Sequence, residues 1–132
     1  VGCSAAIANI RLYMKQNLIS RIRTNSIYFR NRLKEIQASS IVGRVVHKGL
    51  LGALDLVNNN EKKEHPIQML NVHGNRIRPN YFIMEESLKM GVFIRSLGST
   101  IVVIPPLAIC KKDFAFLLDV IYEITQKIEG MV

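Results

Sequence analysis

Residues 91–106 read GVFIRSLGSTIVVIPP, and this stretch decides the fold that the sequence predicts. Two runs rich in β-branched residues, 92–94 and 100–104, flank a short turn in which Gly98 is free to adopt a positive φ angle. The double proline at 105–106 then ends strand pairing, because neither proline can donate a hydrogen bond to a ladder. The stretch therefore predicts a β-hairpin.

Arg95 stands where the first run meets the turn, and it is the one charged residue of the stretch. A planar guanidinium at the mouth of an apolar hairpin is suited to bind a carboxylate through two parallel hydrogen bonds. The alternative is an edge residue lying in solvent, since arginine is mostly exposed in proteins. Inspection of the remaining sequence finds no paired carboxylates, nucleophile elbow, phosphate loop or zinc motif. Arg95 is therefore the candidate substrate-binding residue.

Helical periodicity surrounds the hairpin. Apolar residues recur every three or four positions from about residue 4 to residue 37, which predicts a long helix with a kink or break at 25–26. Pro79 suits the first turn of a helix that ends near Met90, with Met84 and Leu88 on its buried side. A strong apolar stripe predicts a last helix over residues 111–129.

Two further strands are expected at 41–47 and 50–57, joined by a tight turn at Lys48-Gly49. Both faces of the second strand are largely apolar, so we expect it to be central and covered on each side. Residues 58–75 form the only long irregular stretch, and its polar part, 58–64, is expected to be a solvated loop. The order of elements predicts an α+β fold, an antiparallel sheet of about four strands with helices packed on one face.

The net charge of +8 is unevenly distributed. Residues 1–48 hold nine Lys and Arg against one acidic residue, Glu35, whereas 49–132 are balanced. A basic stripe of this kind is open to three interpretations: a solvated face, a surface that meets an acidic partner, or a stand-alone module that binds nucleic acid. The sequence lacks interleaved aromatic residues, zinc-finger spacing and RNA-binding motifs, so a nucleic-acid partner is not favoured.

Composition limits the other classes of function. No apolar run approaches the roughly 18 residues of a membrane span, so no membrane partner is expected. Cys3 and Cys110 are far apart in sequence; buried free thiols in a reducing, cytoplasmic compartment are expected, with a disulfide as the alternative. His47, His65 and His73 lack ligand spacing, so no metal site is expected.

Several segments resemble one family in their sequence and in their order along the chain. They are residues 1–9 (VGCSAAIAN), 41–45 (IVGRV), 48–57 (KGLLGALDLV), 91–95 (GVFIR) and 104–109 (IPPLAI). Together they resemble the C-terminal region of class III, pyridoxal-phosphate-dependent aminotransferases. Within that family, residues 94–98 and 104–106 most resemble the members that act in biotin synthesis. This resemblance implies S-adenosylmethionine as the amino donor and 8-amino-7-oxononanoate as the amino acceptor.

The resemblance implies the small domain of a fold-type-I enzyme, with residues 1–37 as the long helix that enters it and 38–132 as the small domain. It implies that Arg95 binds the carboxylate of the oxo-acid acceptor, or that of the substrate of another class III ω-amino-acid transaminase. It further implies a large domain of the same enzyme and a second subunit, in a homodimer, as partners. The Schiff-base lysine and the other pyridoxal-phosphate ligands would precede Val1. We therefore expect a C-terminal fragment that holds no catalytic residue, binds no cofactor and is inactive by itself.

Overall fold

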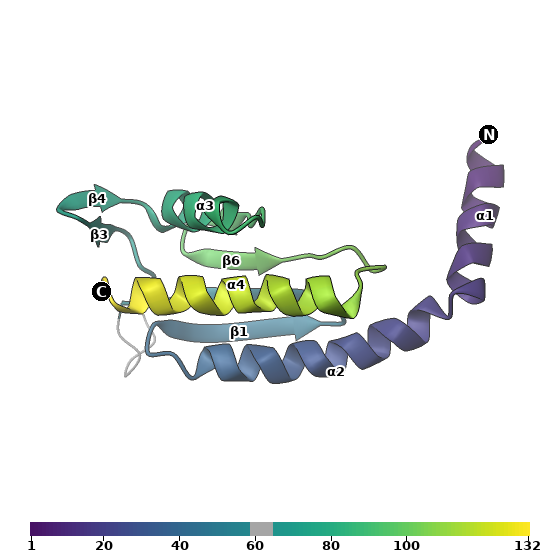
Figure 1. The fold of residues 1–132 in the computed structure, drawn as a ribbon, viewed down its shortest axis with the longest axis horizontal. Helices are drawn as coiled ribbons and strands as arrows, with labels where there is room; N and C mark the ends of the chain where they lie inside the picture. The colour runs from purple at the N-terminus through teal and green to yellow at the C-terminus, as the bar shows by residue number, and fades with distance from the viewer. Residues whose placement is uncertain (59–64) are drawn as a thin grey trace.

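The computed structural model describes residues 1–58 and 65–132, so residues 59–64 of the expected polar loop lie outside the described residues. The chain forms four helices and six strands in these parts (Figure 1). In order they are α1 (Gly2–Lys15), α2 (Leu18–Gln37), β1 (Val42–Lys48), β2 (Leu51–Leu56), β3 (Leu70–Val72), β4 (Asn75–Ile77), α3 (Pro79–Lys89), β5 (Ser96–Leu97), β6 (Thr100–Val103) and α4 (Lys111–Glu129).

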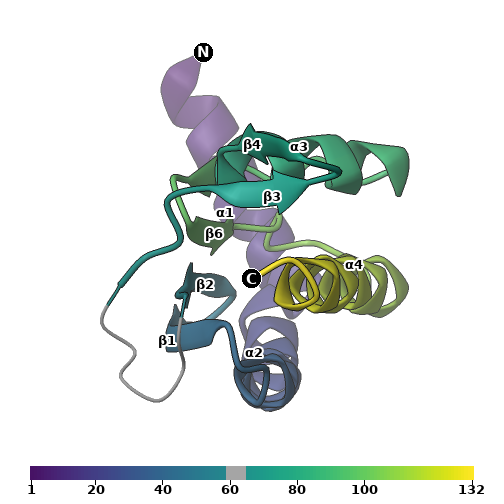
Figure 2. The ribbon, with the colours of Figure 1, turned by 90° about the vertical axis from the view of Figure 1, so that its left-hand side faces the viewer.

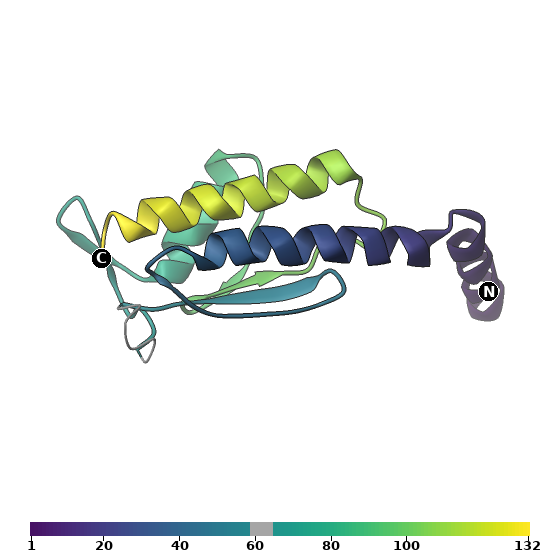
Figure 3. The ribbon, with the colours of Figure 1, turned by 90° about the horizontal axis from the view of Figure 1, so that it is seen from below.

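The main sheet has four strands in the order β1-β2-β6-β5, and every neighbouring pair is antiparallel. Helices α2 and α4 run side by side over one face of this sheet, and α3 lies on the same side (Figures 2 and 3). The predicted α+β architecture, with helices packed on one face of an antiparallel sheet, is therefore confirmed. Strands β3 and β4 form a separate hairpin at one end of the molecule.

The core lies between the sheet and the two long helices. Side chains alternate across a strand, so Leu54 and Leu56 of β2 are fully buried under the helices. Phe29 of α2 packs against Phe114 of α4 with ring centroids 5.4 Å apart. Leu51, on the opposite face of β2, is 51% exposed. The expectation that both faces of this strand are covered is therefore wrong for one face, because all the helices that pack on the sheet lie on the other.

The long N-terminal helix breaks at residues 16–17 instead of at the predicted 25–26. Asn17 adopts a left-handed conformation, φ 49°, which asparagine tolerates better than most residues. Asn25 and Ser26 stay helical because α2 is held by its packed side, from Leu18 to Ile36. Helix α1 stands clear of the body at an angle to α2 (Figure 1), and none of its residues is buried.

Two smaller expectations are also wrong. Residues 58–75 are not irregular throughout, since β3 and β4 pair across a turn at His73-Gly74, where both residues have positive φ angles. Helix α3 buries Phe82, Ile83 and Ser87, whereas Met84 and Leu88 are exposed. The helix carries apolar residues on two sides, and the side that packs toward the core is one position away from the predicted one.

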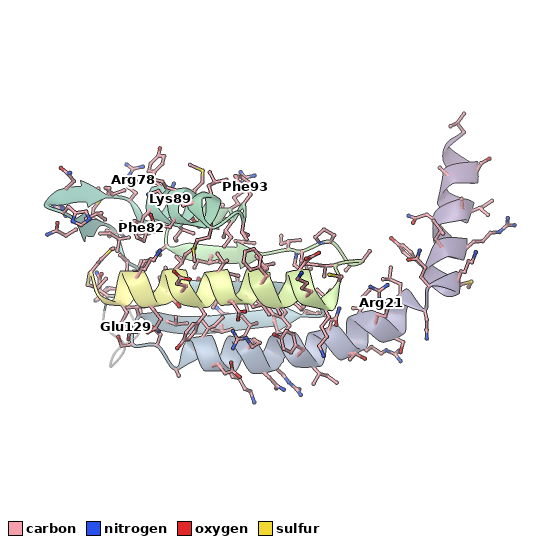
Figure 4. All side chains as sticks on the ribbon, in the orientation of Figure 1. Arg21, Arg78, Phe82, Lys89, Phe93 and Glu129 are labelled. Atoms are coloured by element: carbon pink, nitrogen blue, oxygen red, sulfur yellow. The ribbon has the colours of Figure 1, made fainter. Side chains whose placement is uncertain are left out.

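An ion-pair network joins α3 to α4. Lys127 donates to Glu86 Oε2 over 2.9 Å, and Lys89 donates to Glu86 Oε1 over 2.8 Å. Hydrogen bonds from Lys89 and Lys127 hold the pKa of Glu86 below its ordinary value. Two residues further along, at the same C-terminal end of α4, Glu129 accepts from Ser40 N over 2.7 Å and so fixes the start of the sheet against the helix (Figure 4).

Substitution of Gly52 tests the close packing of α2 on the sheet. A Cβ atom at Gly52 would lie 2.6 Å from Phe29 Cζ, and the Phe29 ring is held by Phe114 and His47. We expect Gly52→Ala to lower the free energy of unfolding by about 1–3 kcal/mol, as overpacking of a core does. Urea unfolding measures it. Gly2→Ala, with open space around the new methyl group, is the control and should cause no loss.

The Glu86 network predicts a dependence of stability on pH. Because the pKa of Glu86 is lowered in the folded state, its contribution is present above the ordinary value of 4.5 and is lost as the pH falls through the folded pKa. Glu86→Gln should therefore be less stable than the parent chain at pH 7, and the difference should vanish in acid. Thermal unfolding between pH 2 and pH 7 measures it. Glu85→Gln, which removes an exposed pair within α3, should have a smaller effect; an equal effect would contradict the assignment.

Candidate functional site

Arg95 lies on the sheet face that the helices leave uncovered. Its neighbour Ile94 is 3% exposed and points into the core, so alternation places Arg95 on the opposite side, where it is exposed. The backbone carbonyl of Arg95 accepts a hydrogen bond from Val102 N over 3.3 Å, which fixes this residue beside β6. The sequence placed Arg95 between a strand at 92–94 and a turn at 96–99, whereas in the structure Ser96 and Leu97 pair with β6 and Arg95 directly precedes this paired arm.

The segment that carries Arg95 differs from the prediction. Residues 92–94 do not form a strand, and β5 is limited to Ser96–Leu97, next to the Gly98 turn. The reason is that this segment bonds to α3 instead of pairing with β6. Val92 N donates to Ser87 O over 2.9 Å, and Ile94 N donates to Ser87 Oγ over 3.3 Å. The hairpin exists, but its first arm is the short β5, and the residues 92–94 that precede it are held by α3.

Arg95 borders a groove of about 400 Å³ whose other walls are apolar: Phe93, Leu97, Val102 and Ile104. Phe93, just beyond the C-terminal end of α3 (Figure 4), is 69% exposed. Among the described residues no carboxylate pairs with Arg95. A guanidinium with apolar neighbours and no internal counter-ion is suited to bind an anionic group that carries an aliphatic chain.

A second groove of about 360 Å³ continues along the same face and shares Val102 and Ile104 with the first. Its remaining apolar walls come from β1 and β2 and include Val46, Leu51 and Ala53. We call the surface formed by these five residues the open face. The open face lies next to Arg95. A contiguous exposed apolar surface of this kind is typical of one that another part of a protein covers.

The polar residues that line the second groove are His47 and Lys48, at the end of β1. Asp55 accepts a hydrogen bond from Thr100 Oγ1 over 2.7 Å, so one of its oxygens is engaged by β6. A larger cavity, of about 510 Å³, lies between residues 91–94 and α4. Its walls include one acidic residue, Asp113, and no cation, so it is unsuited to bind a carboxylate. The groove at Arg95 is the candidate site for an anionic group.

Other kinds of site find little support in the described residues. There, no three His, Cys, Asp or Glu side chains lie together as metal ligands would, and no helix is long and apolar enough to cross a membrane. Cys3 and Cys110 are free, but both are exposed, so the expectation of buried thiols is wrong. Cys110 lies at the surface because it begins α4, where its Sγ accepts from Asp113 N over 3.3 Å.

The basic residues of the N-terminal part are spread over α1, α2 and β1. Arg32 is engaged by Glu35 and Asp119, and Arg21 donates to Ala108 O over 3.5 Å, near the loop that enters α4 (Figure 4). Among the described residues, these basic side chains do not line a common groove in which a nucleic-acid strand could lie.

The sequence named Arg95 as a candidate but missed the walls of its groove. Phe93, Arg95 and Leu97 alternate, and this spacing was the available signal that they share a face. Val102 and Ile104 could not be assigned to the groove from sequence, because their exposure depends on which face of the sheet the helices cover. Ser87 gave no signal, because its partner is a backbone amide seven residues away.

Comparisons with known proteins agree with this fold. The model of the family described as Aminotransferase class-III matches residues 1–125. An adenosylmethionine-8-amino-7-oxononanoate aminotransferase of Methanocaldococcus jannaschii is 31% identical over 122 residues, which are 92% of this chain and 25% of the relative. Gamma aminobutyrate transaminase 1, mitochondrial, of Solanum lycopersicum is 25% identical over 120 residues, 91% of this chain and 22% of that protein.

A solved structure shows the same arrangement. The crystal structure of the Methanocaldococcus jannaschii aminotransferase superposes with a TM-score of 0.80 and 28% identity, over 96% of this chain and 27% of that one. The chain thus spans about a quarter of the length of the curated relatives it matches.

Proposed function

Because the chain belongs to the class III aminotransferases, we propose that it is the acceptor-binding part of a pyridoxal-phosphate-dependent transaminase, with Arg95 binding the carboxylate of the oxo-acid acceptor. The observation that carries this proposal is the placement of Arg95. It is exposed, unpaired among the described residues, and set in an apolar groove. A charge-assisted pair with a carboxylate in such a place contributes about 1.5–3 kcal/mol to binding.

We further propose that the acceptor is 8-amino-7-oxononanoate and the donor S-adenosylmethionine, in biotin synthesis. Several of the relatives carry the name of this aminotransferase. The groove supports the acceptor by its chemistry, since Phe93, Leu97 and Val102 line an apolar path beside the guanidinium. Such a path suits a carboxylate separated from its ketone by an aliphatic chain.

The alternative is another class III ω-amino-acid transaminase. The tomato relative is named for γ-aminobutyrate, an amino acid with a terminal amino group, so members with such donors match this chain too. An arginine in an apolar groove would also bind the carboxylate of an ω-amino acid. No observation on the described residues favours a nucleic-acid-binding module, and we do not propose one.

Pyridoxal phosphate does not fit the described groove residues. The walls at Arg95 include no lysine to form a Schiff base, no acidic residue to face a pyridinium nitrogen and no helix N-terminus to bind a phosphate. We therefore propose that the cofactor is bound by parts of the parent enzyme outside this chain, and that the chain is inactive by itself. Its own contribution is to hold and orient the acceptor and, once its apolar walls are covered, to keep water away from the guanidinium.

The partners follow from the same surface. We propose that the open face is covered by the large domain of the same enzyme and that the active enzyme is a homodimer. The support is that the five apolar side chains of the open face line a groove that no described helix covers, and that the chain spans about a quarter of the length of its relatives. A cytoplasmic location is proposed from the two free, exposed thiols, which persist in a reducing compartment.

Substitution of Arg95 tests the proposed role. In the full-length parent enzyme, Arg95→Ala should raise the KM of the oxo-acid acceptor by roughly tenfold or more, because the charge-assisted pair is lost. Steady-state kinetics with varied acceptor measure it. Arg95→Lys should recover part of the loss, since the ammonium keeps the charge but not the planar fork. Lys112→Ala removes an exposed cation outside the groove and serves as the control; an unchanged KM in Arg95→Ala would remove Arg95 from the site.

The choice of donor separates the proposed reaction from its alternative. With 8-amino-7-oxononanoate as acceptor, the parent enzyme should form product from S-adenosylmethionine and not from β-alanine. Chromatographic detection of the product measures it. Turnover with β-alanine or another ω-amino acid, and none with S-adenosylmethionine, would establish the alternative and leave the role of Arg95 to be tested with that substrate.

A further inference from the structure

We propose that Ser87 is a positioning residue for Arg95: its buried hydroxyl fixes the segment 92–95 against α3 and thereby aims the guanidinium at the acceptor. This inference rests on the proposed function, because the orientation of Arg95 matters only if Arg95 binds substrate. Ser87 lies in the last turn of α3 and is 0% exposed. It does not contact the groove itself.

The hydroxyl of Ser87 both donates and accepts a hydrogen bond. It donates to Met84 O over 3.0 Å and accepts from Ile94 N over 3.3 Å. The carbonyl of Ser87 accepts from Val92 N over 2.9 Å. One residue therefore fixes two of the three backbone positions that precede Arg95, and its hydroxyl satisfies a backbone amide that would otherwise be buried without a partner.

The segment needs this support because it is not a strand. Gly91, with φ 80°, follows the end of α3, and the first bond to β6 is the one that the Arg95 carbonyl accepts from Val102 N, next to the short β5. Between these points the bonds to Ser87 and the burial of Ile94 hold the chain. A shift of the Ile94 amide is passed directly to the adjacent Arg95, and a displacement of about 1 Å at a substrate-binding group is enough to impair catalysis severely.

The chain contains a matched hydroxyl without this link. Thr125 of α4 is also 0% exposed, and its Oγ1 donates to Tyr122 O three residues earlier, over 2.6 Å, as Ser87 does to Met84. Among the described contacts, the Thr125 hydroxyl accepts no bond from another segment. Removing each hydroxyl in turn separates the general cost of losing a buried hydroxyl from the specific loss of the Ile94 contact.

The test uses the full-length parent enzyme and three measurements. Ser87→Ala should raise the KM of the oxo-acid acceptor roughly three- to tenfold, the scale of one lost neutral hydrogen bond, while the KM of the amino donor stays unchanged. Ser87→Cys keeps a weak donor and acceptor, so its acceptor KM should lie between that of the parent enzyme and that of Ser87→Ala. Thr125→Val should leave both KM values unchanged. Hydrogen–deuterium exchange of the Ile94 amide should be faster in Ser87→Ala and unaltered in Thr125→Val.

Combination with Arg95→Ala decides whether Ser87 acts through Arg95. In the Arg95→Ala background, Ser87→Ala should cause no further rise in the acceptor KM, because no guanidinium is left to position. An additive rise, or an acceptor KM that Ser87→Ala alone does not change, overturns this inference and leaves the proposed function intact. An unchanged KM in Arg95→Ala alone overturns the proposed function, and the role of Ser87 falls with it.

Discussion

The alternation of side chains across a four-stranded antiparallel sheet determines the two surfaces of this chain. Helices α2 and α4 cover one face, where Leu54 and Ile101 are fully buried. The same alternation sends Val102 and Arg95 to the other face, which the described helices leave open. The alternation of side chains therefore produces both the core on one side of the sheet and the apolar surface with its guanidinium on the other.

The chemical role of Arg95 depends on what its surroundings lack. Most arginines at a protein surface lie in water, where an ion pair contributes little. Arg95 instead borders apolar walls, and once the open face is covered the pair with a carboxylate would form away from bulk solvent, where its attraction is stronger. On the proposed role, the hydrogen bonds of the preceding segment to Ser87 would reduce the entropy that is lost when the carboxylate binds.

The sequence was informative where a local pattern determines the structure and misleading where tertiary packing does. The turn at Gly98, strand β6 and the α+β order follow from β-branched residues, turn residues and helical periodicity, all of which are local, whereas the first arm of the hairpin lies at Ser96–Leu97 and not at the predicted 92–94. The break at Asn17 was missed because the apolar stripe continues through it, and Met84 was assigned to the core because α3 is apolar on two sides. Arg95 was found as a lone charge, but the groove around it depends on which sheet face the helices cover.

The crystal structure of the parent enzyme with a bound acceptor, or an unreactive analogue that keeps its carboxylate, tests the central claim most directly. The account predicts the carboxylate oxygens within about 2.7–2.9 Å of the Arg95 guanidinium nitrogens, with the aliphatic chain against Phe93 and Val102. A carboxylate held by another cation, with Arg95 directed into solvent, would contradict it.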